Sequence, residues 1–299
     1  MIRADSSTKI GIGHIMRDLV LAGQYKNANI IFATMNLRGN INHKITEAGY
    51  EVVILNTNQP LELSKVLKKY QIDLLVFDHY QIDYKFEMKI KNTVNVKILS
   101  LDDTYEKHHC DIILNHNMSA NTEKYTGLVP NNCEIRCGSQ YTLIRDEFIV
   151  ERGKIRKKET GNTIIFLAMG GSDYNNITLD ILNVLKFFDK ININLTVTDS
   201  NPNLASLKEF VKNNTWVNIH INSNKLAQLM NESDFAIVSP SVILHEVIYM
   251  QLPFIAIKTA SNQSDIFNYL KFKNNMIMDT LIIDKLKKYI KLQIRKANL

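Results

Sequence analysis

Residues 163–177 read TIIFLAMGGSDYNNI and decide the fold class of the chain. The first seven positions form an almost uninterrupted apolar run, which is typical of a strand buried on both faces. Two glycines and several polar residues follow, and a helical apolar pattern then continues to residue 188. A buried strand, a Gly-rich turn and a helix in immediate succession form the building unit of a parallel α/β sheet.

The same alternation extends through most of the chain, so we predict an α/β protein with two doubly wound Rossmann-like domains. The predicted strands are 29–35, 51–55, 74–79, 96–101, 163–169, 195–198, 217–221, 235–239 and 254–258. The predicted helices include 61–70, 177–188, 204–211, 225–230, 242–250 and 282–294. The polar stretch ERGKIRKKETGN, residues 151–162, is the predicted linker between an N-terminal domain, 1–150, and a C-terminal domain, 163–299.

Length and composition exclude several classes of protein. The 299 residues correspond to two domains at ~150 residues each. No apolar run approaches the ~18 residues of a membrane span, and the first residues, MIRADSSTKI, lack the apolar core of a secretory signal. Three cysteines form no disulfide framework, which favours a reducing cytoplasm. The net charge of +6 comes from scattered basic residues, so it gives little support for nucleic acid as a partner.

The first strand-to-helix turn is predicted to hold a general base. Gly11 and Gly13 remove side chains where a backbone must come close to a ligand, and His14 begins the following helix. The positive end of the helix dipole disfavours an imidazolium ion, so His14 is expected to be neutral and able to accept a proton. Arg17 lies one turn further along this helix. The alternative is an ordinary tight turn with a surface histidine.

Two turns in the second half are candidates for binding a diphosphate. Gly170, Gly171 and Ser172 end one strand, and Asn175 or Asn176 is expected to cap the next helix, leaving free amides for an anion. In the other turn, Ser239 and Ser241 lie at a helix mouth, suited to phosphate oxygens or to a cap. The alternative for the first turn is a simple Gly-containing connection.

Glu246 lies inside an otherwise apolar helix, where an unpaired carboxylate is costly. A pair of ribose hydroxyls would satisfy it, as would a buried salt bridge or a position facing solvent. Two further turns end strands with polar residues: Asp78-His79-Tyr80 in the first half, and Asn262 with Gln263 in the second. Either of these turns is also compatible with an ordinary polar loop.

Several chemical sites are not supported by spacing. His108-His109-Cys110-Asp111 has no second Cys or His pair at zinc spacing, and Cys133 to Cys137 is not a CxxC pair but a short predicted strand. The chain has no GxxxxGK[ST] phosphate loop and no GxSxG nucleophile elbow. We therefore expect no metal and no cofactor.

A series of motifs in order along the chain resembles one enzyme family. The motifs are RADSSTKIGIGHIMRD, LLVFDHY, LSLDDTYEKHHCDIILNHN, CGSQYTLIRDEF, MGGSD, SNPNL and the helix from SPS through Glu246 to Pro253. Together they resemble the UDP-2,4-diacetamido-2,4,6-trideoxy-β-L-altropyranose hydrolases of pseudaminic acid synthesis, which have the glycosyltransferase-B (GT-B) architecture with an interdomain cleft. The resemblance covers roughly residues 1–275. It departs at Gln251, where many GT-B chains carry glycine, and in a very short first strand.

The resemblance implies a cytoplasmic, metal-independent enzyme, monomeric or homodimeric, that removes UDP from a small-molecule UDP-sugar by water attack at the anomeric carbon with inversion. It implies His14 as the catalytic base, with Tyr80 and Asn262 holding water or sugar. The implied substrate-binding residues are Gly13, Arg17, Gly170, Gly171, Ser172, Asn176, Ser239, Ser241 and Glu246. Nucleic acid and membranes are not expected partners. A glycosyltransferase using a UDP-sugar donor is the alternative reading, and a non-catalytic binder is a more distant one.

Overall fold

The computed structural model describes residues 1–154, 161–170, 173 and 175–297, and the chain divides into two compact units. Unit 1 comprises Met1–Leu143 and unit 2 comprises Ile144–Leu299. The division falls seven residues before the end of the domain expected from the sequence, because helix α5 (Asp146–Arg152) packs with helix α8 (Leu226–Asn231) inside unit 2. Residues 155–160, half of the expected linker 151–162, lie outside the described residues.

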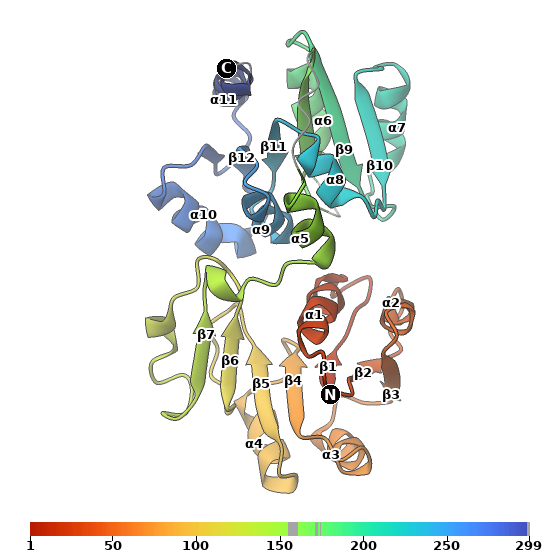
Figure 1. Cartoon of the computed structure of the whole chain (residues 1–299), viewed down its shortest axis with the longest axis vertical. Coiled ribbons are helices and arrows are strands. Elements are labelled where there is room, and N and C mark those ends of the chain that lie inside the picture. The colour runs from red at the N-terminus through yellow and green to blue at the C-terminus, as the bar shows by residue number, and fades with distance from the viewer. Residues whose placement is uncertain (155–160, 171–172, 174, 298–299) are drawn as a thin grey trace. The chain divides into compact units, whose positions relative to one another are not determined.

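Unit 1 is a seven-stranded parallel sheet in the order β3-β2-β1-β4-β5-β6-β7. Its strands are β1 (Ile2–Ala4), β2 (Ile31–Met35), β3 (Glu51–Leu55), β4 (Leu74–Asp78), β5 (Lys97–Leu101), β6 (Ile112–Asn115) and β7 (Glu134–Cys137). Its helices are α1 (Gly13–Gln24), α2 (Asn42–Glu47), α3 (Pro60–Lys69), α4 (Tyr84–Thr93) and the short 3-10 turns Thr122–Tyr125 and Ser139–Tyr141. In Figure 1 the arrowheads of β4 to β7 point the same way, and α1 lies at that end of the sheet.

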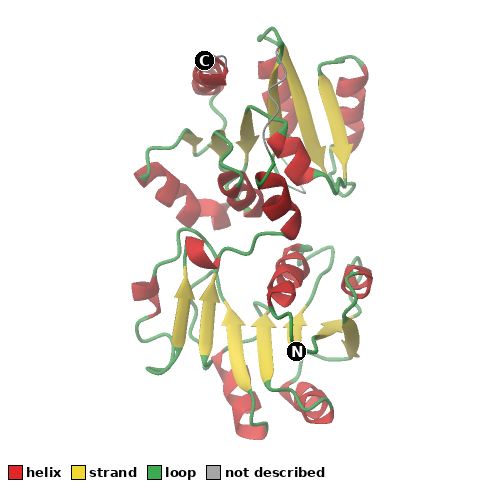
Figure 2. Cartoon of the chain, in the orientation of Figure 1, coloured by secondary structure: helices red, strands yellow, loops and turns green. Residues whose placement is uncertain are grey.

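Unit 2 repeats the design in its described part, with the strand order β10-β9-β8-β11-β12-β13. Its strands are β8 (Thr163–Ala168), β9 (Ile191–Val197), β10 (Val217–Ile221), β11 (Phe235–Val238), β12 (Phe254–Ile257) and β13 (Ile277–Met278). Besides α5 and α8, its helices are α6 (Ile177–Leu185), α7 (Leu204–Lys212), α9 (Val242–Tyr249), α10 (Ser264–Phe272), α11 (Ile283–Ala297) and the 3-10 turn Ser261–Gln263. Figure 2 shows helices flanking the strands in each unit.

The strand order identifies where each unit binds ligands. Counted within each unit, the order 3-2-1-4-5-6 is that of the doubly wound Rossmann fold, which binds its ligands at the point where the strand order reverses. In unit 1 the reversal lies between β1 and β4, where Ala4 pairs with Asp78. In unit 2 it lies between β8 and β11, where Ala168 pairs with Val238. These two positions are therefore where the sites should be.

The strands that flank these positions are buried, as their apolar runs predict. Every residue of β11 is 0% exposed, and Leu75, Val76 and Phe77 of β4 are at most 3% exposed. Strands β4, β8, β11 and β12 each end one residue before the predicted end, so His79, Met169, Ser239 and Lys258 belong to the following turns. Helices α2, α4, α5 and α10 and strand β13 were not anticipated. In the described part of the chain, no helix combines the length and apolar character that a membrane crossing requires.

Candidate active site

His14 and Asp78 form the centre of the site in unit 1. The turn before α1 needs Gly11, whose φ of +85° lies in the left-handed region, and His14 is the second residue of the helix. Its Nδ1 lies 2.7 Å from Oδ1 of Asp78 and 3.1 Å from the Asp78 main-chain oxygen. A carboxylate accepts a hydrogen bond, so Nδ1 carries a proton, and in the neutral ring Nε2 therefore carries the lone pair. The pair is therefore built to present Nε2 as a proton acceptor.

The free nitrogen of His14 reaches the surface although the ring is mostly covered. His14 is 7% exposed, yet its Nε2 is not among the fully buried, unpartnered atoms of the described residues. Tyr80 stands beside the ring, with the two ring centres 4.9 Å apart and their planes at 89°. Tyr80 is 66% exposed, and its hydroxyl donates to Asp103 at 3.1 Å. The structure thus brings two of the three expected catalytic residues together at the end of β4.

Arg17 anchors the Asp78 carboxylate. Its Nε donates to Oδ2 of Asp78 at 2.6 Å, its Nη2 donates to Oδ1, and its Nη1 donates to Asp103 at 3.2 Å. Burial opposes the charge of Asp78, but Arg17 and His14 outweigh it and hold the pKa of that carboxyl well below its usual range. The sequence assigned Arg17 to the substrate. In the structure its donors are directed to the carboxylates that support His14 and Tyr80.

The neighbouring histidine has no such freedom. His79 directs Nε2 to Oδ2 of Asp5 at 3.1 Å, and its Nδ1 accepts the amide of Gln81 at 3.1 Å. Asp5 is itself held by both terminal nitrogens of Arg3, a side chain with no exposed surface. Both ring nitrogens of His79 are therefore occupied by structural hydrogen bonds, and His14 is the better candidate for proton transfer.

Unit 2 places Gly170 and Ser239 side by side at its own strand reversal. Gly170 follows β8 with φ of +92°, and a Cβ there would lie 3.7 Å from Oγ of Ser239. Ser239 is buried, and its Oγ lies 3.0 Å from Oγ of Ser241, the residue that precedes α9. Neither hydroxyl caps the helix. Among the described residues no acceptor is found for the first amides of α9, those of Val242 and Ile243.

This arrangement suits an anion. Uncapped amides at the positive end of a helix dipole, with two hydroxyls beside them, are the groups that bind phosphate oxygens. The prediction that Ser239 and Ser241 lie at a helix mouth is confirmed.

The turn before α6 differs from the prediction. Asp173, not Asn175 or Asn176, caps this helix, because its two carboxylate oxygens accept the amides of Ile177 and Thr178, each at 2.9 Å. Asn176 precedes the helix with φ of +54° and makes no cap bond, so the expectation that an asparagine caps α6 was wrong. The free amides expected there are satisfied by the chain itself. Gly171 and Ser172 lie outside the described residues.

Glu246 has a partner that was not anticipated. Nε and Nη2 of Arg145 contact its Oε1 at 2.9 and 2.8 Å, and Arg145 also contacts Glu147 at 2.7 Å. Glu246 is 5% exposed, and burial raises its pKa to about 7 although Arg145 opposes the shift. The salt bridge considered as an alternative is therefore present. Oε2 accepts no hydrogen bond from the described residues and is not fully buried, which leaves it for a second hydrogen bond.

The last predicted turn is only partly described. Asn262 lies in the 3-10 turn Ser261–Gln263 after β12, and its side chain is outside what the structure describes. Gln263 accepts the amide of Thr259 at 2.8 Å and so closes this turn. Gln263 is therefore already engaged within its own turn.

No family model matches the chain, but individual proteins do. It is 41% identical to the UDP-2,4-diacetamido-2,4,6-trideoxy-β-L-altropyranose hydrolase of Campylobacter jejuni over 273 residues, which cover 91% of this chain and 96% of that protein. The chain belongs to this hydrolase family. More distantly, it is 23% identical to the spore coat polysaccharide biosynthesis protein SpsG of Bacillus subtilis, over 88% of this chain and 78% of that one.

Solved structures match this chain in fold. MurG of Acinetobacter baumannii matches with a TM-score of 0.64 at 12% identity, covering 99% of this chain and 91% of MurG. Anabaena HepE, solved in complex with UDP and glucose, matches with a TM-score of 0.63 at 11% identity, covering 99% of this chain and 90% of HepE. At these identities the likeness shows the GT-B fold alone: two Rossmann-like domains.

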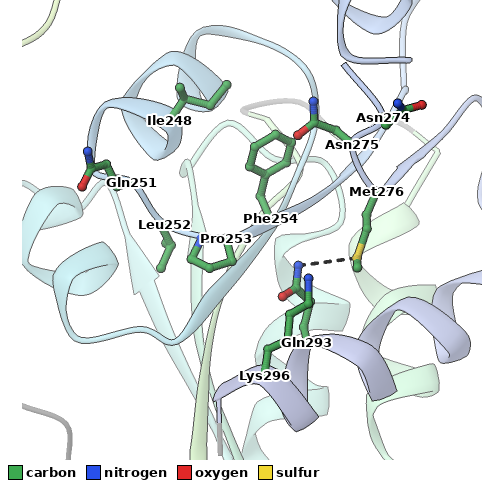
Figure 3. Close-up of a pocket in the computed structure, with 10 residues that line it drawn as sticks. All are labelled: Ile248, Gln251, Leu252, Pro253, Phe254, Asn274, Asn275, Met276, Gln293 and Lys296. Atoms are coloured by element: carbon green, nitrogen blue, oxygen red, sulfur yellow. Dashed lines mark hydrogen bonds between the residues drawn. The ribbon is translucent and has the colours of Figure 1, made fainter. Parts of the chain in front are cut away.

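A cavity elsewhere in unit 2 of this hydrolase-family chain is not the expected ligand site. It measures about 370 Å³, and Figure 3 shows its lining, with Nε2 of Gln293 directed at the sulfur of Met276. Phe254 and Met276 line it at the amino ends of β12 and β13, whereas Rossmann-type ligands lie at the carboxyl ends. None of the predicted site residues contributes to it.

The remaining polar candidates have structural partners. His108 directs Nδ1 to Oε1 of Glu87 at 2.8 Å, and Sγ of Cys110 lies 3.7 Å from Sγ of Cys133. Within the described residues, no group of three or more His, Cys, Asp and Glu side chains is arranged to hold a metal ion.

Proposed function

We propose that this chain hydrolyses UDP-2,4-diacetamido-2,4,6-trideoxy-β-L-altropyranose, releasing UDP and the free sugar. Membership of the hydrolase family supports the reaction class. The observation that carries the assignment of roles is the 2.7 Å contact between His14 and Asp78 at the strand reversal of unit 1. It supplies a base with a defined free nitrogen at the position where this fold binds its ligands.

Unit 2 is proposed to hold UDP. Oε2 of Glu246 is available to a ribose hydroxyl, while Ser239, Ser241 and the first amides of α9 are available to the diphosphate. Gly170 allows the diphosphate to come close to the backbone beside Ser239. These donors stabilise the negative charge that develops on the leaving diphosphate. Gly171, Ser172 and Asn176 remain sequence-based candidates for substrate binding, although the first amides of α6 are already bonded to Asp173.

Unit 1 is proposed to supply the base. Water attacks the anomeric carbon, its proton passes to Nε2 of His14, and the bond from that carbon to the diphosphate oxygen breaks with its electron pair leaving on UDP. A single displacement of this kind inverts the anomeric centre. Tyr80 and Asn262 are proposed to hold water or sugar, and Gly13 to leave room for the substrate. Arg17 supports the site through Asp78 and Asp103.

Hydrolysis in oxygen-18 water tests the proposal. The purified chain, incubated with the UDP-sugar, a chelator and no acceptor, should release UDP and place the label on the sugar. Label in UDP would show attack at phosphorus and would refute the mechanism. Failure to release free sugar without an acceptor alcohol would instead indicate a glycosyltransferase.

The proposal includes a place in pseudaminic acid biosynthesis, and so in flagellin glycosylation, as the family resemblance implies. A cytoplasmic location is part of it, since all three cysteines are free thiols and the substrate is a nucleotide sugar. The small-molecule substrate is the only partner that the proposal requires.

A further inference from the structure

Asp18 is a buried carboxyl for which the reaction above has no use. It follows His14 by four residues on α1, so the two side chains share one face of the helix. Asp18 has 0% exposure, and neither of its oxygens accepts a hydrogen bond from any residue in the described part of the chain. An ionised carboxylate in that position would be buried without a donor, which is strongly unfavourable.

The polar group next to Asp18 is the carboxylate that orients His14. Asp18 lies within hydrogen-bonding reach of Asp78, which is only 1% exposed. Two adjacent carboxylates would carry two negative charges against the single permanent positive charge of Arg17. A proton on Asp18 removes this imbalance and also supplies the donor that the pair lacks.

Asp78 has room to accept that donor. Its Oδ1 already accepts His14 Nδ1 and Arg17 Nη2, whereas its Oδ2 accepts only Arg17 Nε among the described residues. A carboxylate oxygen has two lone pairs, so Oδ2 is able to accept one more hydrogen bond. Burial, and after it the charge of Asp78, raise the pKa of Asp18 well above its ordinary value, which favours the protonated form.

We infer that Asp18 is a positioning residue: a neutral carboxylic acid that donates a hydrogen bond to Asp78 and so fixes the carboxylate plane that holds His14. The Asp78 carboxylate then accepts hydrogen bonds from three side chains: the His14 imidazole, the Arg17 guanidinium and the Asp18 carboxylic acid. Asp18 acts through Asp78 and does not touch the substrate. This inference deepens the proposed function and rests on it for its kinetic consequence.

The kinetic experiment compares D18N with D18L in the full chain. Asparagine keeps the donor but cannot ionise, whereas leucine keeps the approximate volume and removes the donor. D18L should lower kcat by about 10- to 100-fold with KM changed by less than about 3-fold, because one hydrogen bond to a charged group is lost. D18N should restore kcat to within about 3-fold of the wild type. The matched control is D180N, which removes the carboxylate of an exposed aspartate on α6 and should leave kcat unchanged.

Two spectroscopic readouts are independent of activity. Glu246, whose pKa is about 7, is itself partly protonated at neutral pH, so the infrared spectra are recorded in the E246Q background. In that background the spectrum should contain the carbonyl stretch of a protonated carboxylic acid with Asp18 intact and in D180N, and D18N should lack it. The ¹⁵N-edited proton spectrum should show the His14 Nδ1–H resonance at the same position in wild type and D18N, and shifted or lost in D18L.

These results separate the inference from the proposed function. Loss of activity in D18N equal to that in D18L would show that an ionised carboxylate is needed, and would overturn the inference. An infrared band that survives in D18N, or an unchanged His14 resonance in D18L, would also overturn it. If D18L does not fold, D18N and its infrared spectrum decide. A wild-type chain that does not hydrolyse the UDP-sugar would refute the proposed function, while the two spectra would still test Asp18.

Discussion

His14 and Asp78 are 64 residues apart in the sequence, yet Nδ1 of the histidine lies 2.7 Å from Oδ1 of the aspartate. The contact exists because β1 and β4 are neighbours in the sheet, which brings the loop after β1 and the end of β4 to one edge. An aspartate behind a histidine selects the tautomer and holds the ring. The pair therefore determines which nitrogen is available for proton transfer.

Replacing Asp78 with asparagine should expose this dependence. The amide no longer requires a proton on Nδ1 and releases the ring, so kcat should fall by about a thousandfold or more, as in other aspartate–histidine pairs. KM should change little. The variant should also melt at a lower temperature, because breaking a buried pair such as Asp78–Arg17 costs about 3 to 5 kcal/mol. Steady-state kinetics below the melting temperature provide the measurement, and a folded variant within tenfold of wild-type kcat would contradict the assignment.

His14 and His79 offer a matched pair of substitutions. H14Q should lose about 100- to 10,000-fold in kcat, the usual contribution of a general base, while its Kd for UDP stays the same. H79Q disturbs the hydrogen bonds to Asp5 and Gln81, so it should lower stability by about 1 to 3 kcal/mol. Its kcat should stay within about tenfold of wild type. Steady-state kinetics, UDP titration and thermal unfolding of both variants test these expectations. An equal loss of kcat in H14Q and H79Q would contradict the assignment of His14, and not His79, as the base.

The fold could be predicted from the sequence because its signal is local. Runs such as FAIV at β11 are apolar at every position, and strands buried on both faces need that composition. The turns that follow such strands also predicted where Gly170, Ser239 and His14 would lie. Helices such as α4, with the sequence YKFEMKIKNT, were missed because only three of its ten residues are buried, which makes the apolar stripe narrow.

The partners of the site residues could not be predicted, because each comes from a distant part of the chain. Arg145 is 101 residues from Glu246, and nothing local to the helix of Glu246 indicates which cation will reach it. The cap of α6 was assigned to Asn175 or Asn176 and not to Asp173, since either residue type before a helix is able to cap it. Arg17 was assigned to the substrate because the sequence does not reveal that Asp78 and Asp103 compete for it.

Glu246 predicts a pH-dependent stability. Burial raises its pKa to about 7 in the folded chain, against an ordinary value of 4.5. Because the folded pKa is the higher one, this carboxyl contributes its full stability below pH 4.5 and loses it as pH rises to about 7. The free energy of unfolding of wild type should therefore fall relative to E246Q by about 3 kcal/mol between pH values of about 4 and 8. Urea unfolding of both proteins at the two pH values measures it, and a difference that does not vary with pH would contradict the shift.

The last prediction distinguishes the two helix N-termini of unit 2 as diphosphate sites. The amides of α6 are already bonded to Asp173, whereas those of α9 have no acceptor among the described residues and lie beside Ser239 and Ser241. The double variant S239A/S241A should therefore raise the Kd for UDP by about tenfold or more. Its Kd for uridine should change little, since uridine lacks the phosphates that the hydroxyls bind.

The D173A variant is the counterpart for α6. It removes a cap and should cost about 1 kcal/mol of stability, while its Kd for UDP stays within about 3-fold of wild type. Calorimetric titration of UDP and uridine into both variants, with thermal unfolding of each, makes the comparison. The reverse pattern, in which D173A loses UDP binding and S239A/S241A retains it, would place the diphosphate at α6. In that case an incoming phosphate would have to displace the Asp173 carboxylate, which is also negatively charged, from its two amides. We do not expect this displacement, because the amides of α9 are uncapped and can bind the phosphate directly.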